Sequence, residues 1–507
     1  MKKSADLKTF GKATLPFIIK SRLPDHKNSL VSSATTIFGT LSTTAAIVGL
    51  HHYYRKQQQP EARLVDYFTG LKGQLRAIPA LSSTSTLFKN HIHNSYQQAK
   101  QGWQQSHLKD LKNLEPVSEC HNKNTSADFS AWHTTVLVPR PVCWISGVSS
   151  MPTPINAAMN TDTSSDKRCF GVVGIDAERQ IVWQTTMPER VHDIVIQPKL
   201  DDSLATAKVR HVVVMGRRPS EKFWVLDSAS GQVKHAIKAD TDRHFYGHAC
   251  YSLDGTQLYV TENDTVDLTG KIGIYDVTHN YQKMAEFDSY GIGPHELIMH
   301  PDSETLIIAN GGIKTEQASR EELNLETMRP SLVYLERHTG KLLEQITPEH
   351  NQISIRHLAM HDDGTVMIGI QFQGEKHLNV PLVLTHKRGD AKLTPLTMPN
   401  NQWQRFHQYI ASVAVDSQHD LLCVTTPIGG CAAIYDLSTY QLIDSVTLLD
   451  CAGASIAKTK YGDSHLGFAV SDGQGQLTTL RVNKQNKNIA IDSQYHEMAF
   501  DNHLQAL

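Results

Sequence analysis

A unit of about fifty residues recurs through the second two thirds of this 507-residue chain. Each copy contains a short apolar strand that ends in an acidic residue and a turn, and neighbouring copies lie 49 to 60 residues apart. The copies end at Asp176, Asp227, Asp276, Glu336, His386 (a degenerate copy) and Asp436, and a last one at 479–482 lies about 45 residues further on. Seven β-rich copies of this length are typical of a β-propeller, in which each copy forms one blade.

Residues 247–286 show how one blade is predicted. Alternating apolar and polar residues mark four strands, at 247–252, 257–261, 271–276 and 281–286. The pair Asp254-Gly255 suits the positive backbone angles of a tight hairpin between the first two. We therefore predict an all-β fold, a seven-bladed β-propeller that spans residues 131–507.

The first unit lacks an innermost strand of its own, and the end of the chain can supply one. A strand at 143–148 precedes Asp176, but no innermost strand precedes that strand in turn. The sequence Phe-Asp-Asn-His-Leu at 500–504 has the required character. A blade shared by both ends of the chain closes the ring and removes an exposed sheet edge. We predict that this C-terminal strand closes the propeller.

Residues 1–56 have the layout of an export signal. Seven Lys or Arg and only two acidic residues lie within 1–29, and residues 30–50 carry no charge. A basic lead-in before an uncharged stretch is typical of a signal peptide or membrane anchor. We expect export, or anchoring through residues 30–50, and a soluble leader is the alternative.

Between residues 57 and 130 the apolar residues change to helical spacing. One stripe consists of Leu64, Tyr67, Phe68, Leu71 and Leu75. We predict an α-helical extension and linker, an amphipathic hairpin that packs on the propeller or on itself. A partner-binding module is the alternative.

Composition excludes several classes of function. A net charge of −2 with 20% charged residues gives no electrostatic footprint for nucleic acid. The seven cysteines contain no Cys-x-x-Cys pair, which argues against a zinc ribbon and against a dense disulfide scaffold. The sequence also lacks the serine-hydrolase elbow, the Walker loop, the His-Glu-x-x-His motif and the Rossmann fingerprint. No catalytic residue is therefore predicted from a motif.

Histidines recur at one register of the repeat, at the predicted start of the innermost strands. They are His192, His248, His295, His357 and, from the closing strand, His503, whereas Ser412 and Ser455 hold this register in the other two blades. Because innermost strands line the channel, we expect these side chains to converge at its mouth. Five imidazoles can hold copper, iron or another transition metal, or a haem. The neighbouring Asp193 and Glu296 can orient them or bind directly.

A structural role is the alternative for these histidines. A buried imidazole needs hydrogen-bond partners, and propellers commonly use such histidines to hold a blade together. Candidate anion or ligand contacts near the same face are Arg217, Arg243, Arg356 and Asn263. Each arginine can equally form a surface ion pair.

Long strings of residues in the second part of the chain carry a resemblance to a known family. They are Arg243–His248, Tyr259–Asp264, Gly291–Leu297, Ala309–Ile313, Leu323–Met328, Ser354–Ala359 and Asp501–Leu504. From about Cys143 to its end, the chain resembles the bacterial domain-of-unknown-function family 1513. The resemblance implies a periplasmic seven-bladed propeller, often encoded beside imelysin-like iron-regulated and di-haem peroxidase-like proteins. It implies no reaction.

The chain departs from that family at its N-terminus. About 140 residues precede the matching part, where members usually carry a short twin-arginine leader, and this leader has no Arg-Arg pair. The route of export is therefore open.

Two classes of function follow, and we favour the first. It is a non-enzymatic periplasmic protein that binds a metal, a haem or a partner protein in iron or copper handling, with an imelysin-like protein as the candidate partner. The second is an enzyme, either a metal-dependent oxidoreductase or a lactonase-like hydrolase that uses Glu262, Asn263, His295 and Glu296. A structural interaction scaffold is a third reading.

Overall fold

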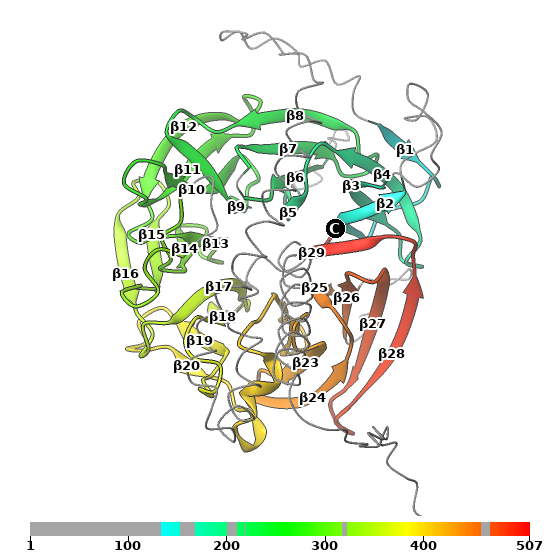
Figure 1. Ribbon diagram of the computed structural model, residues 1–507. Coiled ribbons are helices and arrows are strands. Elements are labelled where there is room, and N and C mark those ends of the chain that lie inside the picture. Colours follow the sequence, from blue (N-terminus) through cyan, green and yellow to red (C-terminus); the bar gives the residue numbers. More distant parts are fainter. Residues whose placement is uncertain (1–132, 153–167, 200–209, 219, 317–321, 458–466) are drawn as a thin grey trace, which may run out of the picture. The chain divides into compact units, whose positions relative to one another are not determined.

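Seven antiparallel sheets surround a central axis (Figure 1). The computed structural model describes residues 133–152, 168–199, 210–218, 220–316, 322–457 and 467–507. The all-β, seven-bladed propeller predicted from the repeat is confirmed. The predicted export signal (1–56) and helical extension (57–130) lie outside the described residues.

Six blades are four-stranded meanders, numbered here from the innermost strand outward. The second blade consists of β5 (Val191–Ile196), β6 (His211–Gly216), β7 (Lys222–Asp227) and β8 (Val233–Lys238). The third consists of β9 (Arg243–Tyr251), β10 (Gln257–Asp264), β11 (Gly270–Asp276) and β12 (Gln282–Asp288). The fourth consists of β13 (Pro294–Met299), β14 (Thr305–Asn310), β15 (Ser331–Glu336) and β16 (Leu342–Ile346). The fifth blade consists of β17 (Ile353–Met360), β18 (Thr365–Phe372), β19 (Val383–Lys387) and β20 (Thr394–Pro395). The sixth consists of β21 (Ser412–Asp416), β22 (Leu421–Thr426), β23 (Cys431–Asp436) and β24 (Gln441–Thr447). The seventh consists of β25 (Cys451–Ile456), β26 (Gly467–Asp472), β27 (Gln476–Asn483) and β28 (Asn488–Tyr495). Two 3-10 turns, Pro399–Asn401 and Trp403–Phe406, follow the fifth blade.

The first blade combines both ends of the described chain. Its strand order is β1-β4-β3-β2-β29, so the innermost strand β29 (Ala499–Ala506) comes from the C-terminus. The other strands are β2 (Trp144–Pro152), β3 (Arg168–Ile175), β4 (Ile181–Met187) and the short outer β1 (Thr134–Val136). β29 pairs antiparallel with β2, for example Ser146 with Leu504. The innermost strands then contact one another all the way round, from β29 through β5, β9, β13, β17 and β21 to β25 and back to β29.

The acidic residue that ends the repeated marker strand stabilises the turn after the third strand of a blade. Oδ1 of Asp227 accepts a hydrogen bond from the backbone N–H of Ala229 at 2.8 Å, and Oδ1 of Asp276 accepts one from Thr278 at 2.8 Å. Such side-chain caps replace backbone partners in tight turns. The residue that made the repeat visible in the sequence therefore has a local structural role.

The core fills the spaces between neighbouring sheets. The indole N–H of Trp144 donates to the carbonyl of Ile456 at 3.0 Å and so links the first and seventh blades. Trp183 donates to the carbonyl of Ser228 at 3.2 Å and links the first and second. Both tryptophans are almost completely buried. Hydrogen bonds of this kind tie neighbouring blades together.

Strand β29 is anchored by both apolar and charged contacts. Phe500 and Leu504 are 3% and 1% exposed. The buried carboxylate of Asp501 accepts hydrogen bonds from Arg190, which precedes the second blade, at 2.6 and 2.9 Å. The closing strand is thereby tied to the blades on either side of it.

No helix in the described part of the chain is long and apolar enough to cross a membrane. The predicted anchor at residues 30–50 lies outside that part.

Deleting residues 499–507 is expected to destabilise the whole propeller. The deletion removes two core side chains, which cost about 2–5 kcal/mol each when truncated, and leaves β2 with an unpaired edge. We expect the free energy of unfolding to fall by more than about 4 kcal/mol, measured by urea denaturation and calorimetry.

The matched control is Tyr495→Ala on the outermost strand β28, where the side chain is 65% exposed. This substitution is expected to change stability by less than about 0.5 kcal/mol. An unaltered unfolding midpoint in the truncated protein would show that β29 does not close the ring.

Candidate metal centre

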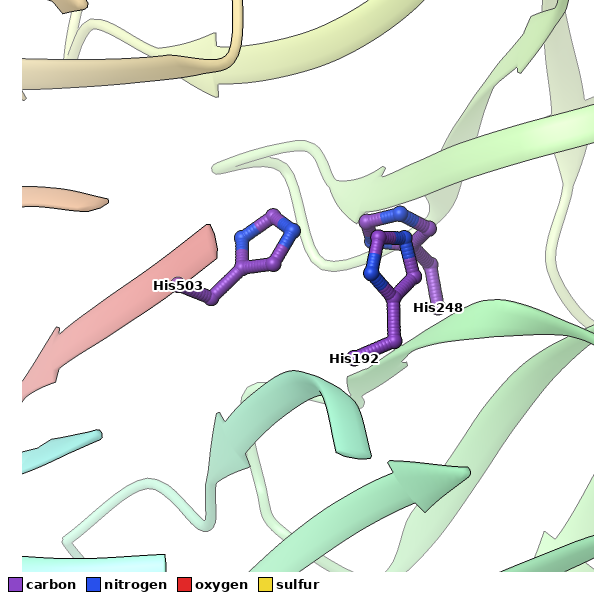
Figure 2. Close-up of side chains that lie close together, drawn as sticks. All are labelled: His192, His248 and His503. Atoms are coloured by element: carbon purple, nitrogen blue, oxygen red, sulfur yellow. The ribbon is translucent and has the colours of Figure 1, made fainter. Parts of the chain in front are cut away.

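The five histidines at one register of the repeat lie in a single cluster. Going round the blades, the ring centroids are 5.1 Å apart for His503 and His192, 4.7 Å for His192 and His248, 4.6 Å for His248 and His295, 4.9 Å for His295 and His357, and 5.4 Å for His357 and His503. Figure 2 shows three of these rings pointing toward one another from β29, β5 and β9. We call these five residues the histidine cluster.

An irregularity in strand pairing accompanies every histidine of the cluster. The register shifts between Val191 and Ile194 on β5, between Pro294 and Glu296 on β13, and between Ile355 and His357 on β17; β9 and β29 shift around His248 and His503 in the same way. In contrast, β21, which carries Ser412, pairs with β22 without a shift. Bulges of this kind re-aim side chains and are common beside functional sites.

The strand boundaries differ from the sequence prediction in one detail. His248, His357 and His503 do not begin their strands, because β9, β17 and β29 start at Arg243, Ile353 and Ala499.

Two carboxylates face the Nδ1 atoms of three histidines. Asp193 places Oδ2 at 3.2 Å from Nδ1 of His248 and Oδ1 at 3.7 Å from Nδ1 of His503. Glu296 places Oε2 at 3.0 Å from Nδ1 of His357. A carboxylate on one ring nitrogen fixes the orientation of the ring and leaves the other nitrogen available, as is usual for metal-binding histidines.

Several buried ring nitrogens of the cluster have no hydrogen-bond partner among the described residues. They are Nδ1 of His192 and His295 and Nε2 of His248 and His503, whereas Nδ1 of His248 faces Oδ2 of Asp193 at 3.2 Å. A buried histidine with a structural role looks different: His386 has Tyr334 Oη at 2.7 Å and the carbonyl of Asp390 at 3.0 Å. An unpaired buried polar atom costs about 1–3 kcal/mol. The hydrogen bonds expected of a histidine that pins a blade are thus missing at these four nitrogens.

Burial keeps four of the five imidazoles uncharged at neutral pH. It lowers the pKa of His503 to about 4, and takes the pKa of the other three well below the usual range (His192, His295 and His357). Burial acts in the same direction on His248, but the carboxylate of Asp193 outweighs it and raises the pKa of this ring. Burial also raises the pKa of Glu296 to about 7. Neutral imidazole is the form that binds a metal.

A cavity of about 420 Å³ runs along the channel and reaches the cluster. All seven innermost strands line it, and Asp193, Glu296, His357 and His503 are among its lining residues. The side chains of His248, His357 and His503 are only 0%, 3% and 6% exposed, whereas His192 and His295 are half-buried, so most of the cluster lies inside the channel. Ser412 and Ser455 line the same cavity.

Two of the four candidate anion contacts lie beside the cluster. Nη1 of Arg217 is 3.4 Å from Asp501, and the charge of Arg217 contributes to lowering the pKa of His192 after burial and the neighbouring histidines. Arg356 acts in the same way on His295. Both arginines oppose the protonated form of nearby rings.

The other two candidates belong to a different part of the third blade. Arg243 pairs with Glu286 at 2.8 Å and with Asp264 at 2.7 Å. The amide of Asn263 donates to the backbone carbonyl of Asp264 at 3.1 Å. The side chains of both residues are thus engaged with local partners, and their contact with a ligand stays a prediction.

The spacing of the rings suits metal ions. Two imidazoles on one tetrahedral ion, with metal–nitrogen distances of about 2.1 Å, have centroids roughly 5 Å apart. Ligand nitrogens within 4.8 Å of one another form two triads, His192/His248/His503 and His248/His295/His357. A haem fits less well, because a macrocycle bound to one ring would overlap its neighbours at 4.6–6.1 Å. The donor set therefore suits a transition-metal ion.

One glycine that positions the cluster was not predicted from the sequence. A Cβ atom at Gly247 would lie 2.7 Å from Cδ2 of His192, and the residue has φ +110°. Only glycine adopts that backbone conformation without strain. The signal in the sequence was the glycine directly before His248 at a ligand register.

These features define a seven-bladed β-propeller with a buried histidine cluster in its channel. Residues 185–507 match the family described as "Protein of unknown function (DUF1513)", and the chain belongs to that family. The resemblance seen in the sequence is thereby confirmed.

Curated proteins give no match to the chain. Among solved structures, Kuenenia stuttgartiensis hydrazine synthase is similar at 13% identity and a TM-score of 0.44, covering 66% of this chain and 98% of the other. A mitotic checkpoint complex is similar at 14% identity and a TM-score of 0.41, covering 68% and 89%.

Replacing Glu286 with Gln is expected to lower the free energy of unfolding, because it removes a charge from the ion-pair network around Arg243. Burial acts to raise the pKa of Glu286, but Arg243 and Lys283 outweigh it and lower the pKa to about 2. Because the folded-state pKa is depressed, the stabilisation is complete above about pH 4.5 and is lost as the pH falls toward 2. We expect Glu286→Gln to lose about 2 kcal/mol at pH 7 and less at pH 3, measured by urea denaturation at both values.

Glu375→Gln serves as the control, since the Glu375 side chain is 77% exposed. Equal losses at pH 7 and pH 3 for Glu286→Gln would contradict an electrostatic origin.

Proposed function

We propose that this protein binds a divalent transition-metal ion through the histidine cluster and serves metal handling in the cell envelope. The observation that carries the proposal is the set of buried, unpaired imidazole nitrogens within ligand distance of one another. Protein interiors rarely leave such atoms unsatisfied. A bound ion satisfies several of them at once.

The donor set indicates which ions bind best. All ring donors are imidazoles and the adjacent oxygens are carboxylates, a combination that suits copper, zinc, nickel and iron. For a fixed site, affinity among first-row divalent ions rises toward copper and then falls at zinc. The expected order is therefore Cu²⁺ before Ni²⁺ and Zn²⁺, with Fe²⁺ weakest.

A role in the periplasm, with an imelysin-like protein as partner, is the setting that we propose for this binding activity. The support is the family resemblance together with the basic, then uncharged, beginning of the sequence. Iron and copper are the metals that this setting implies.

A metal-dependent oxidoreductase is the second candidate, because the 420 Å³ cavity reaches the cluster and gives a small molecule room beside it. The lactonase-like alternative has less support. Oε1 of Glu262 accepts a hydrogen bond from Tyr275 at 2.7 Å and Oε2 pairs with Lys283 at 2.8 Å. Glu262 therefore belongs to a structural network of its blade.

The test is metal binding by the purified full-length chain. We expect Cu²⁺ to bind with sub-micromolar affinity in calorimetry and to remain bound after desalting, as measured by elemental analysis. The triple variant His248→Ala/His295→Ala/His357→Ala is expected to lose at least 100-fold in affinity, because it removes one complete triad and a member of the other.

The matched control is His279→Ala/His377→Ala, whose side chains are 74% and 73% exposed and lie outside the cluster. Its affinity is expected to equal that of the original chain. If the unaltered protein takes up no transition metal, the proposed function is wrong.

A further inference from the structure

We infer that the histidine cluster holds two metal ions, with the imidazole of His248 as a bridge between them. This inference rests on the proposed function and specifies how the metal is bound. It follows from three independent features of the cluster: its division into triads, the placement of its carboxylates and the state of the His248 ring.

The ligand nitrogens divide into two sets of three rather than one set of five. His192 and His503 form a triad with His248, and His295 and His357 form the other with the same residue. His248 is the one ring of the cluster in contact with all four others, at centroid distances of 4.6, 4.7, 5.1 and 5.7 Å, whereas the contacts between the two outer pairs are 5.4 and 6.1 Å. His248 is therefore the centre of the cluster.

Each triad has its own carboxylate. Asp193 approaches His248 and His503 at 3.2 and 3.7 Å, on the first triad. Glu296 approaches His357 at 3.0 Å, on the second. Two divalent ions bring four positive charges into a buried site, and two carboxylates with one bridging imidazolate offset three of them. The two carboxylates would balance a single divalent ion, so it is their separate placement, one on each triad, that favours two ions.

Both nitrogens of the His248 ring are buried: Nε2 has no hydrogen-bond partner among the described residues, and Nδ1 faces Oδ2 of Asp193 at 3.2 Å. Its side chain is 0% exposed. One ion satisfies one nitrogen, whereas two ions, each about 2.1 Å from a nitrogen, satisfy both and lie roughly 6 Å apart. Asp193, already at 3.2 Å, is then placed to contribute an oxygen.

The first test is the stoichiometry and magnetism of the unaltered, copper-loaded chain. We expect two Cu²⁺ per protein by elemental analysis after desalting. Two Cu²⁺ ions joined by an imidazolate couple antiferromagnetically, so the electron paramagnetic resonance signal is expected to account for well under half of the copper present. These measurements require no variant.

Paired variants then separate the triads. His192→Asn/His503→Asn and His295→Asn/His357→Asn are each expected to bind one Cu²⁺ and to show a signal for all of it. His248→Asn is expected to remove the coupling. Circular dichroism and the unfolding midpoint identify any variant that fails to fold.

The outcomes distinguish this inference from the proposed function on which it rests. One tightly bound Cu²⁺ per unaltered chain, fully visible by resonance and lost in both paired variants, overturns the bridge and leaves metal binding intact. No bound metal in the unaltered chain overturns both.

Discussion

The pairing of β29 with β2 is the constraint on which the rest of the structure depends. It turns seven sheets in a row into a ring, since every innermost strand then has a neighbour on both sides. The same strand carries Asp501, which binds Arg190 of the adjoining blade, and His503, a member of the histidine cluster. Closure of the ring and assembly of the histidine cluster therefore depend on the same strand pairing. A chain that lacked this pairing would have an exposed sheet edge and an incomplete cluster.

The repeat predicted the fold and the register of the cluster, because both follow from periodicity. A period of about fifty residues identifies equivalent strands, and equivalent positions on innermost strands meet at the axis, which is how His192 and His503 could be related across 311 residues. Side-chain direction has no such period. The bulges that turn each histidine inward depend on local strain, and the partners of Arg243 depend on which strand lies beside β9. The sequence alone therefore left a ligand contact and an ion pair open for Arg243, and the structure shows the ion pairs, with Asp264 and Glu286.

The cluster also destabilises the folded state. Each unpaired buried nitrogen opposes folding by about 1–3 kcal/mol, and a channel filled with aliphatic side chains would avoid this cost. Elsewhere the same chain satisfies both nitrogens of a buried histidine, as His386 shows. What sets the cluster apart from other buried histidines is that five imidazoles gather with ring centroids 4.6–6.1 Å apart, and under the proposed function a bound ion offsets their cost. The five bulges support the same interpretation, because each interrupts regular strand pairing beside a histidine of the cluster. The close approach of Gly247 to His192 likewise serves the shape of the site.

His503 is the last of the five cluster histidines along the chain, which sets an order in time. A ribosome releases this residue only after the four earlier histidines have emerged. Those four are by then present but not yet in their final geometry. The complete cluster thus cannot exist before β29 has been made and has paired with β2. Under the proposed function, metal is therefore taken up where the ring closes, so the place of folding, rather than the place of synthesis, decides which ions compete for the site.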